Sequence, residues 1–211
     1  MSIDRQPHAT RAIVIACVIV QAVLLLAGPA VDTAMALSGG LIPARLSGAA
    51  SLDHALPAPL TLISSIFLHA GIGHLGFNML FLFLIGRFTE AILGRWRFLL
   101  LFFASGIAGG LAQVALDPAS PIPVVGASGA ISGVFAAHAM IFGRTGGKGE
   151  LARALQLGLM WVGLQVATRF VFGAGGGPDI AIGAHIGGFV AGLLLALPLA
   201  RRALSQPGRR F

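Results

Sequence analysis

Six long apolar segments constrain the fold of this chain more than any other feature of its sequence. They cover about residues 12–30, 72–91, 98–116, 126–142, 151–172 and 180–199. A helix needs about 20 apolar residues to cross the hydrocarbon core of a bilayer. Because each segment ends at a cluster of charges or at a loop rich in Gly and Pro, we expect an all-α, polytopic membrane protein with six membrane-spanning helices.

The composition agrees with the bilayer as the solvent of this chain. Hydrophobic residues make up 56% and charged residues 10% of its 211 residues, and soluble domains carry about 25% charged residues. The net charge of +7 would suit a nucleic acid, but the charges form short clusters between apolar segments. We therefore expect the lipid bilayer as a partner and no nucleic acid. Cys17, the single cysteine, indicates no disulfide within the chain.

The basic residues predict the orientation of the helices, because cytoplasmic loops carry an excess of Lys and Arg. If the N-terminus is cytoplasmic, all of the 14 Lys and Arg residues except Arg45 and Arg169 lie on the cytoplasmic side. We expect a cytoplasmic segment 1–11, a membrane domain 12–199 and a basic cytoplasmic tail 200–211. The first segment, with Ala34-Met35-Ala36 after it, also fits a cleaved signal peptide; we expect it to be retained.

The second, fourth and sixth segments then run in the same direction, so their first turns lie at a similar depth. His74 and Asn78 share one helix face at the start of the second segment. Ser128 lies in the first turn of the fourth segment, and His185 lies about one turn into the sixth. Polar and ionisable groups are costly inside a membrane, so this set indicates a functional site.

These residue types favour acyl transfer by a serine nucleophile. Ser128 needs a base that takes its hydroxyl proton. Histidine is the residue type that usually does this, so His185 is the candidate base. His74, Asn78 and the backbone N–H of Ser128 could donate hydrogen bonds to the oxyanion of a tetrahedral intermediate. Asp179 suits a helix cap better than a third member of a triad. We therefore expect a Ser-His dyad, no cofactor and, since the histidines lack metal-ligand spacing, no metal.

Packing is the alternative for each of these residues taken alone. Small residues let membrane helices approach closely, and the segments of Ser128 and His185 contain two such pairs, Gly129 with Gly133 and Gly188 with Gly192. A single histidine or asparagine would also suit an interhelical hydrogen bond. The occurrence of all four polar residues at one depth is what favours a site.

Four groups of residues occur along the chain in a characteristic order: His74-x-x-x-Asn78, Gly86 with Glu90, Gly126-x-Ser128-Gly129, and Ala184-His185-x-x-Gly188-x-x-x-Gly192. Together with six apolar segments they resemble the rhomboid intramembrane serine proteases. The resemblance covers about residues 67–195. It implies a six-transmembrane-helix rhomboid-like bundle that hydrolyses a peptide bond in or near the transmembrane segment of membrane-protein substrates.

The resemblance also implies roles for individual residues. Ser128 and His185 match the catalytic dyad, and His74 and Asn78 match the oxyanion hole. Supporting roles fall on residues around them: His69 helps order the outer loop, Gly126 and Gly129 lie beside the serine, and Glu90 is a structural carboxylate or a polar stop. Ser132, one turn further on, is a supporting residue by its position only. We expect a monomer or weak oligomer in a bacterial inner membrane, with the site facing the outside.

Two positions depart from the family pattern. The first outer loop, about residues 31–65, contains Arg45 as its only arginine and lacks a tryptophan, so the Trp-Arg pair common in the family is missing. Some members carry an aromatic residue where this chain has Ser132, beneath the catalytic histidine. How His185 is supported stays open, and Ser132 could form a hydrogen bond nearby.

Two other functions stay open at the level of sequence. A catalytically inactive relative would bind transmembrane clients without cleaving them, although the intact polar set disfavours this. A transporter or channel would continue its polar residues towards the cytoplasm. The stretch after Asn78, Met79-Leu80-Phe81-Leu82-Phe83-Leu84, is apolar instead.

Overall fold

The computed structural model describes residues 6–142, 152, 156, 158–161, 163 and 181–205. These residues are helical apart from loops and one antiparallel bridge between Leu41 and Val124. In chain order the helices are α1 (His8–Ala27), α2 (Pro29–Gly39), α3 (Pro43–Leu46), η1 (Ala58–Leu60), α4 (Thr61–Ser64), η2 (Ser65–Phe67), α5 (Ile72–Leu93), α6 (Arg95–Leu116), α7 (Ser128–Phe142) and α9 (Ile182–Leu204). Most of the expected fifth span, with Arg169 and Asp179, lies outside the described residues.

Four of the described helices, α1, α5, α6 and α9, are long and apolar enough to cross a membrane. α7 is apolar but has only 15 residues. The apolar pattern suggested a start at Gly126, but α7 begins at Ser128. Gly126 has a φ of 122°, which no α-helix adopts. The expected first span is also split, since Gly28, with a φ of 95°, ends α1 and Pro29 begins α2. α9 continues past the expected boundary at residue 199 to Leu204.

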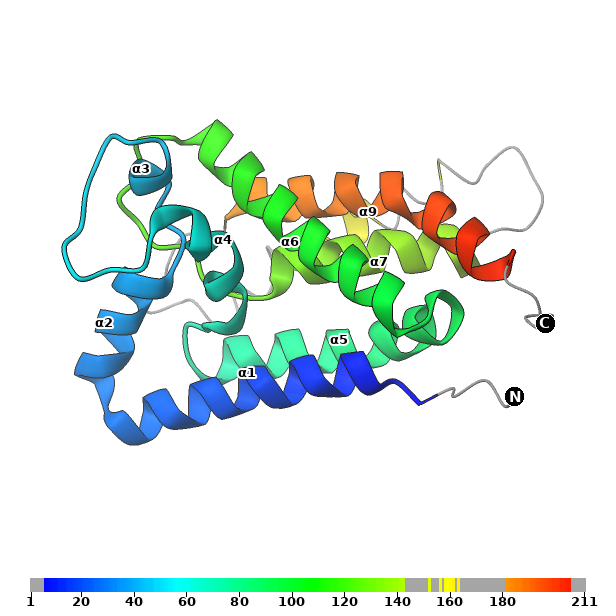
Figure 1. Ribbon diagram of the computed structural model, residues 1–211, viewed down its shortest axis with the longest axis horizontal. Helices are drawn as coiled ribbons and strands as arrows, with labels where there is room; N and C mark the ends of the chain where they lie inside the picture. Colours follow the sequence, from blue (N-terminus) through cyan, green and yellow to red (C-terminus); the bar gives the residue numbers. More distant parts are fainter. Residues whose placement is uncertain are drawn as a thin grey trace.

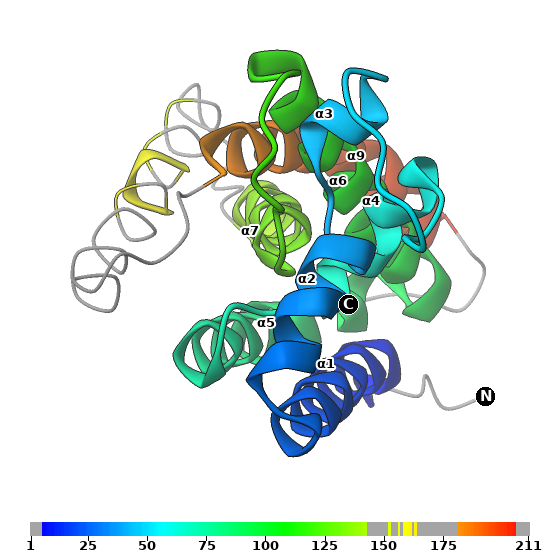
Figure 2. The same cartoon turned by 90° about the vertical axis from the view of Figure 1, so that its left-hand side faces the viewer.

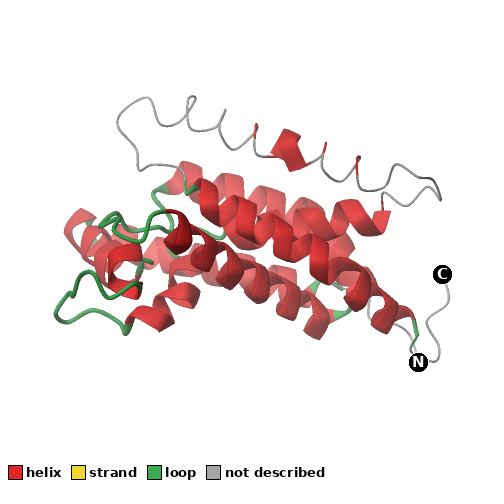
Figure 3. Ribbon diagram, turned by 90° about the horizontal axis from the view of Figure 1, so that it is seen from above, coloured by secondary structure: helices red, strands yellow, loops and turns green. Residues whose placement is uncertain are grey.

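The spanning helices run along the long axis of the molecule (Figures 1 and 3). α1 lies beside α5, and α7 lies between α5, α6 and α9 (Figures 1 and 2). The first turns of α5, α7 and α9 lie at the end that carries α2, α3 and α4, and the first turn of α1 and the last turn of α9 lie at the other (Figure 1). The helices that carry the candidate site residues therefore start at one end of the bundle.

Glycines allow α7 and α9 to touch backbone to backbone. A Cβ atom at Gly188 would overlap the carbonyl oxygen of Gly129, and one at Gly192 would overlap that of Gly133. α9 also lies close to α6, since a Cβ atom at Gly109 of α6 would lie 2.5 Å from the carbonyl oxygen of Ala184. Such contacts are typical of small residues at membrane-helix interfaces, and here they set the distance between α7 and α9.

The segment of about residues 31–65, which the sequence predicted to be the first outer loop, is held by hydrogen bonds. Leu41 and Val124 exchange both backbone hydrogen bonds, at 3.0 and 2.8 Å, so the loop is tied to the segment that leads into α7. Arg45 donates from Nη2 to the carbonyl oxygen of Leu56 at 2.6 Å, across the loop. The arginine therefore braces the loop through the backbone.

Glu90, near the end of α5, accepts hydrogen bonds from the first turn of α1. Its two carboxylate oxygens accept the backbone N–H groups of Ala9 and Thr10 at 2.8 Å each, and Oε2 also accepts the Thr10 hydroxyl at 2.7 Å. Pro7 at the N-cap provides no side-chain cap of its own. A carboxylate satisfies the unpaired N–H groups and the dipole at a helix N-terminus, so Glu90 is the cap of α1.

Replacing Glu90 with Ala should destabilise the packing of α1 on α5. Buried N–H groups without an acceptor cost about 1–3 kcal/mol each, so we expect the free energy of unfolding to fall by about 2–4 kcal/mol. Cys17 of α1 is fully buried, so its reaction with a fluorogenic maleimide during heating reports when α1 separates. Glu90→Gln, which keeps one carbonyl acceptor, should melt between Glu90→Ala and the native protein. Equal melting of all three would contradict the capping role.

Gly192→Ala should destabilise the contact of α7 with α9, because the added methyl group meets the backbone of Gly133. Overpacking of this kind costs about 1–3 kcal/mol. Gly76→Ala is the matched control, since a Cβ atom there meets nothing within 4 Å. Thermal unfolding in detergent micelles, followed by circular dichroism, should show a lower midpoint for Gly192→Ala alone.

Candidate active site

Ser128 and His185 meet at the start of α7 and α9. The imidazole Nε2 of His185 lies 2.8 Å from the hydroxyl Oγ of Ser128. Ser128 is the first residue of α7, and the close contact of Gly129 with α9, where a Cβ atom would lie 3.1 Å from the carbonyl oxygen of Ala184, brings the two side chains within reach. His185 is buried and Ser128 is half-buried. A hydroxyl and an imidazole at this distance can exchange a proton.

His74 lies against the backbone just before Ser128. Its Nδ1 accepts the backbone N–H of Ala70 at 3.3 Å, so a neutral ring carries its proton on Nε2. A Cβ atom at Gly126 would lie 2.7 Å from Cε1 and 3.0 Å from Nε2 of this ring. Gly126 therefore serves two needs, a left-handed backbone conformation and room for His74.

Asn78 lies one helical turn after His74 and is buried. Its amide Nδ2 donates to the carbonyl oxygen of His74 at 2.8 Å. The same nitrogen carries a second hydrogen. This hydrogen bond anchors the amide to its own helix. It uses one of the two amide hydrogens, so the second N–H is not used by this bond.

His69 lies in the loop between η2 and α5 and is 3% exposed. Its Nδ1 lies 3.3 Å from the carbonyl oxygen of Phe67, and its Nε2 has no partner among the described residues. Its ring meets that of His74 edge to face, with centroids 5.4 Å apart. Burial, and after it the neighbouring His74, lower the pKa of His69 to about 3, so this ring is neutral at physiological pH.

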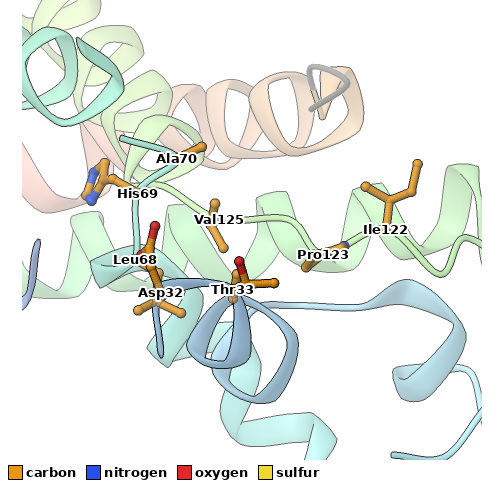
Figure 4. Close-up of a pocket in the computed structure, with 9 residues that line it drawn as sticks. Asp32, Thr33, Leu68, His69, Ala70, Ile122, Pro123 and Val125 are labelled. Carbon is orange, nitrogen blue, oxygen red and sulfur yellow. The ribbon is translucent and has the colours of Figure 1, made fainter. Parts of the chain in front are cut away.

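A pocket of about 230 Å³ lies beside this loop, between α2 and the segments that lead into α5 and α7 (Figure 4). Figure 4 shows the ring of His69 directed away from Thr33 and Pro123. The pocket is lined mainly by apolar side chains, and it comprises Asp32, Thr33, Ala36, Leu68, His69, Ala70, Ile122, Pro123 and Val125. Among the described residues, no group of three His, Cys, Asp or Glu side chains could hold a metal ion.

Trp161 is a residue near the site that sequence reasoning missed. Its indole Nε1 donates to the hydroxyl of Ser132 at 2.8 Å, and that hydroxyl donates to the carbonyl oxygen of Ser128 at 2.8 Å. The sequence offered only a weak signal, namely one of two tryptophans lying inside an apolar segment. Residues 158–161 are helical, and the bond joins Trp161 to a residue of α7 that is 29 positions earlier, so it leaves no mark in a local pattern.

Known proteins with similar sequences identify the family of this chain. The model of the Rhomboid domain matches residues 58–202, which is more than half of the chain. The chain belongs to the rhomboid family. This confirms the resemblance inferred from the sequence motifs. The family and the long apolar helices together show that this rhomboid is an integral, multi-pass membrane protein.

Named rhomboid proteases are among the relatives of this rhomboid. It is 35% identical over 146 residues to rhomboid protease GluP of Bacillus subtilis (strain 168), a match that covers 66% of this chain and 26% of GluP. It is 33% identical over 147 residues to rhomboid-related protein 3 of Homo sapiens, with 66% and 36% covered. Rhomboid protease AarA of Providencia stuartii is 30% identical over 151 residues, with 63% and 53% covered. The matches thus span only part of each relative.

Gly126→Ala should disturb the site more than the fold. The added Cβ atom would overlap the His74 ring, and a displacement of about 1 Å near a reacting centre costs about 10²-fold in rate. We expect Ser128 to react with a fluorophosphonate about 10²-fold more slowly. Gly73→Ala, beside His74 but with nothing within 4 Å of its Cβ atom, should react at the native rate. A native rate in Gly126→Ala would show that the ring is not held there.

Proposed function

We propose that this rhomboid is an intramembrane serine endopeptidase in which Ser128 is the nucleophile and His185 is the base. The observation that carries the proposal is the distance of 2.8 Å between Ser128 Oγ and His185 Nε2. A serine hydroxyl becomes a useful nucleophile when a base lies within hydrogen-bond reach. Relatives named as rhomboid proteases, such as GluP and AarA, support the same reaction class.

The reaction follows from the donors and acceptors at this point. Nε2 of His185 accepts the hydroxyl proton while Oγ of Ser128 attacks the carbonyl carbon of the scissile peptide bond. His185 then passes the proton to the leaving amine, and an acyl-enzyme forms. A water molecule, deprotonated by His185, attacks the acyl carbon and releases the new carboxyl group, and Ser128 regains its proton.

Three N–H groups could donate hydrogen bonds to the oxyanion of each tetrahedral intermediate. His74 offers Nε2–H, because its Nδ1 is occupied by the N–H of Ala70. Asn78 offers the second N–H of the amide that its helix already anchors. The third donor is the backbone N–H of Ser128, at a helix N-terminus where the first N–H groups have no helical acceptor. Removing one such donor typically costs about 10²–10³-fold in rate.

The substrate class follows from the position of the site within apolar helices. Rhomboid proteases act on membrane proteins within the bilayer, so we propose transmembrane segments as substrates, cleaved in or near the membrane. An intact substrate helix uses its carbonyl groups in its own hydrogen bonds, so a segment with helix-breaking or small residues should be favoured. The pocket in Figure 4 offers a side chain of such an unwound segment an apolar site.

The wider arrangement of the proposed enzyme is a six-helix bundle with both termini in the cytoplasm. The last turn of α9 carries Arg201 and Arg202, as the preference for cytoplasmic basic residues requires. Ser128 and His185 lie towards the opposite end, which would face the outside. We propose that the protein works there without a cofactor, as a monomer or weak oligomer in a bacterial inner membrane.

Labelling with a fluorophosphonate tests the proposed nucleophile. The native protein in lipid nanodiscs should be labelled, and Ser128→Ala should give no signal because it lacks the proposed nucleophile. Ser105→Ala is a control, since Ser105 also lies in a helix but is buried, and its hydroxyl has no partner among the described residues. It should be labelled like the native protein. Folded native protein that stays unlabelled would refute the enzyme and favour an inactive relative.

A further inference from the structure

We propose that Trp161 is a positioning residue for the nucleophile, acting through Ser132 on the backbone of Ser128. The inference rests on the proposed function, since it concerns the reactivity of Ser128. Three groups form one continuous chain, from the indole N–H of Trp161 to the hydroxyl of Ser132 and on to the carbonyl group of Ser128, at 2.8 Å per hydrogen bond.

The chemistry of the groups determines which one donates and which one accepts in each of these two hydrogen bonds. An indole nitrogen can only donate, so the Ser132 oxygen accepts from Trp161 and its own proton is free to reach Ser128. Trp161 is 2% exposed and Ser132 is 0% exposed. Buried hydrogen bonds of this kind are not exchanged for water, and an unmade one leaves a costly unsatisfied group. The link therefore holds the first turn of α7 in one arrangement.

Aromatic contacts hold the indole ring in place. Trp161 stacks on Phe135 of α7, with centroids 5.0 Å apart and planes at 17°. It also meets Phe81 of α5 edge to face, at 4.9 Å and 67°. Contacts with two helices leave the ring little freedom to turn its N–H away from Ser132. Trp161 thereby ties the turn that carries the nucleophile to α5, the helix of His74 and Asn78.

The small size of Ser132 and the presence of Trp161 depend on each other. Ser132 is completely buried, and its hydroxyl is already in contact with the indole, so a large side chain at this position would collide with Trp161. The support that an aromatic residue would supply on α7 is supplied here by an indole from another helix. It reaches Ser128 through a hydroxyl and acts on the backbone of the nucleophile.

The consequence for the reaction is geometric. The carbonyl group of Ser128 belongs to the same residue whose Oγ must stay 2.8 Å from His185. Without the link, the first turn of α7 has one fewer restraint at the end where its helical hydrogen bonds begin. Neither Trp161 nor Ser132 needs to touch the substrate for the rate to change.

Labelling kinetics of the full-length protein in nanodiscs test this role. Trp161→Phe keeps an aromatic ring but removes the N–H, and Ser132→Ala removes the acceptor. We expect each to slow fluorophosphonate labelling about threefold to tenfold, the loss that one hydrogen bond can cause. The double variant should be no slower than the slower single variant, because both changes break the same link.

Matched controls separate positioning from general damage. Trp96→Phe makes the same chemical change at a tryptophan that is 71% exposed, and Ser105→Ala removes a buried hydroxyl without a partner among the described residues. Both should label at the native rate. Native labelling rates in Trp161→Phe and Ser132→Ala, or losses that multiply in the double variant, would overturn the proposal.

Nuclear magnetic resonance gives a readout that does not depend on activity. The chain has two tryptophans, so Trp96→Phe assigns the indole N–H signal of Trp161. That signal should exchange slowly with deuterium, and Ser132→Ala should speed the exchange. Trp161→Phe should also shift the imidazole signals of His185. If the native protein proves unlabelled, the proposed function fails, whereas unshifted His185 signals in folded Trp161→Phe would overturn the positioning role by itself.

Discussion

The backbone contact between α7 and α9 is the constraint on which the rest of the site depends. Gly188 and Gly192 lie against the carbonyl groups of Gly129 and Gly133, where any larger residue would force the helices apart. A polar pair can act across two helices only if its geometry is held to within about 0.5 Å. The glycines that suggest mere packing in the sequence are therefore also what makes the contact of Ser128 with His185 possible.

Buried polar groups of this protein find hydrogen-bond partners on other segments of the chain. Glu90 accepts the N–H groups that begin α1, and Trp161 donates to Ser132. Each of these groups would be costly if left unpaired in an apolar surrounding. The same hydrogen bonds connect segments that are far apart in the sequence. Apolar helix surfaces alone have little preference for one neighbour over another, so these bonds help to fix which helices pack together.

Much of the fold could be predicted from the sequence, because a bilayer requires long apolar helices. The residues of the candidate site followed from their common depth, and the family from their order. The observed differences concern where helices begin and end. The helix start at Gly126 was wrong because a left-handed glycine precedes α7, and the first span was too long because Gly28 and Pro29 interrupt it.

The sequence by itself determined the family, the apolar helices and the polar residues that share a depth, since these depend on residue type and spacing along a helix. Only the tertiary structure decided which atoms meet. It showed Glu90 as the cap of α1, Arg45 as a brace of the loop that follows α3, and Trp161 as the partner of Ser132. These contacts join residues on different segments, and their distances depend on how closely the helices pack, which no single segment encodes.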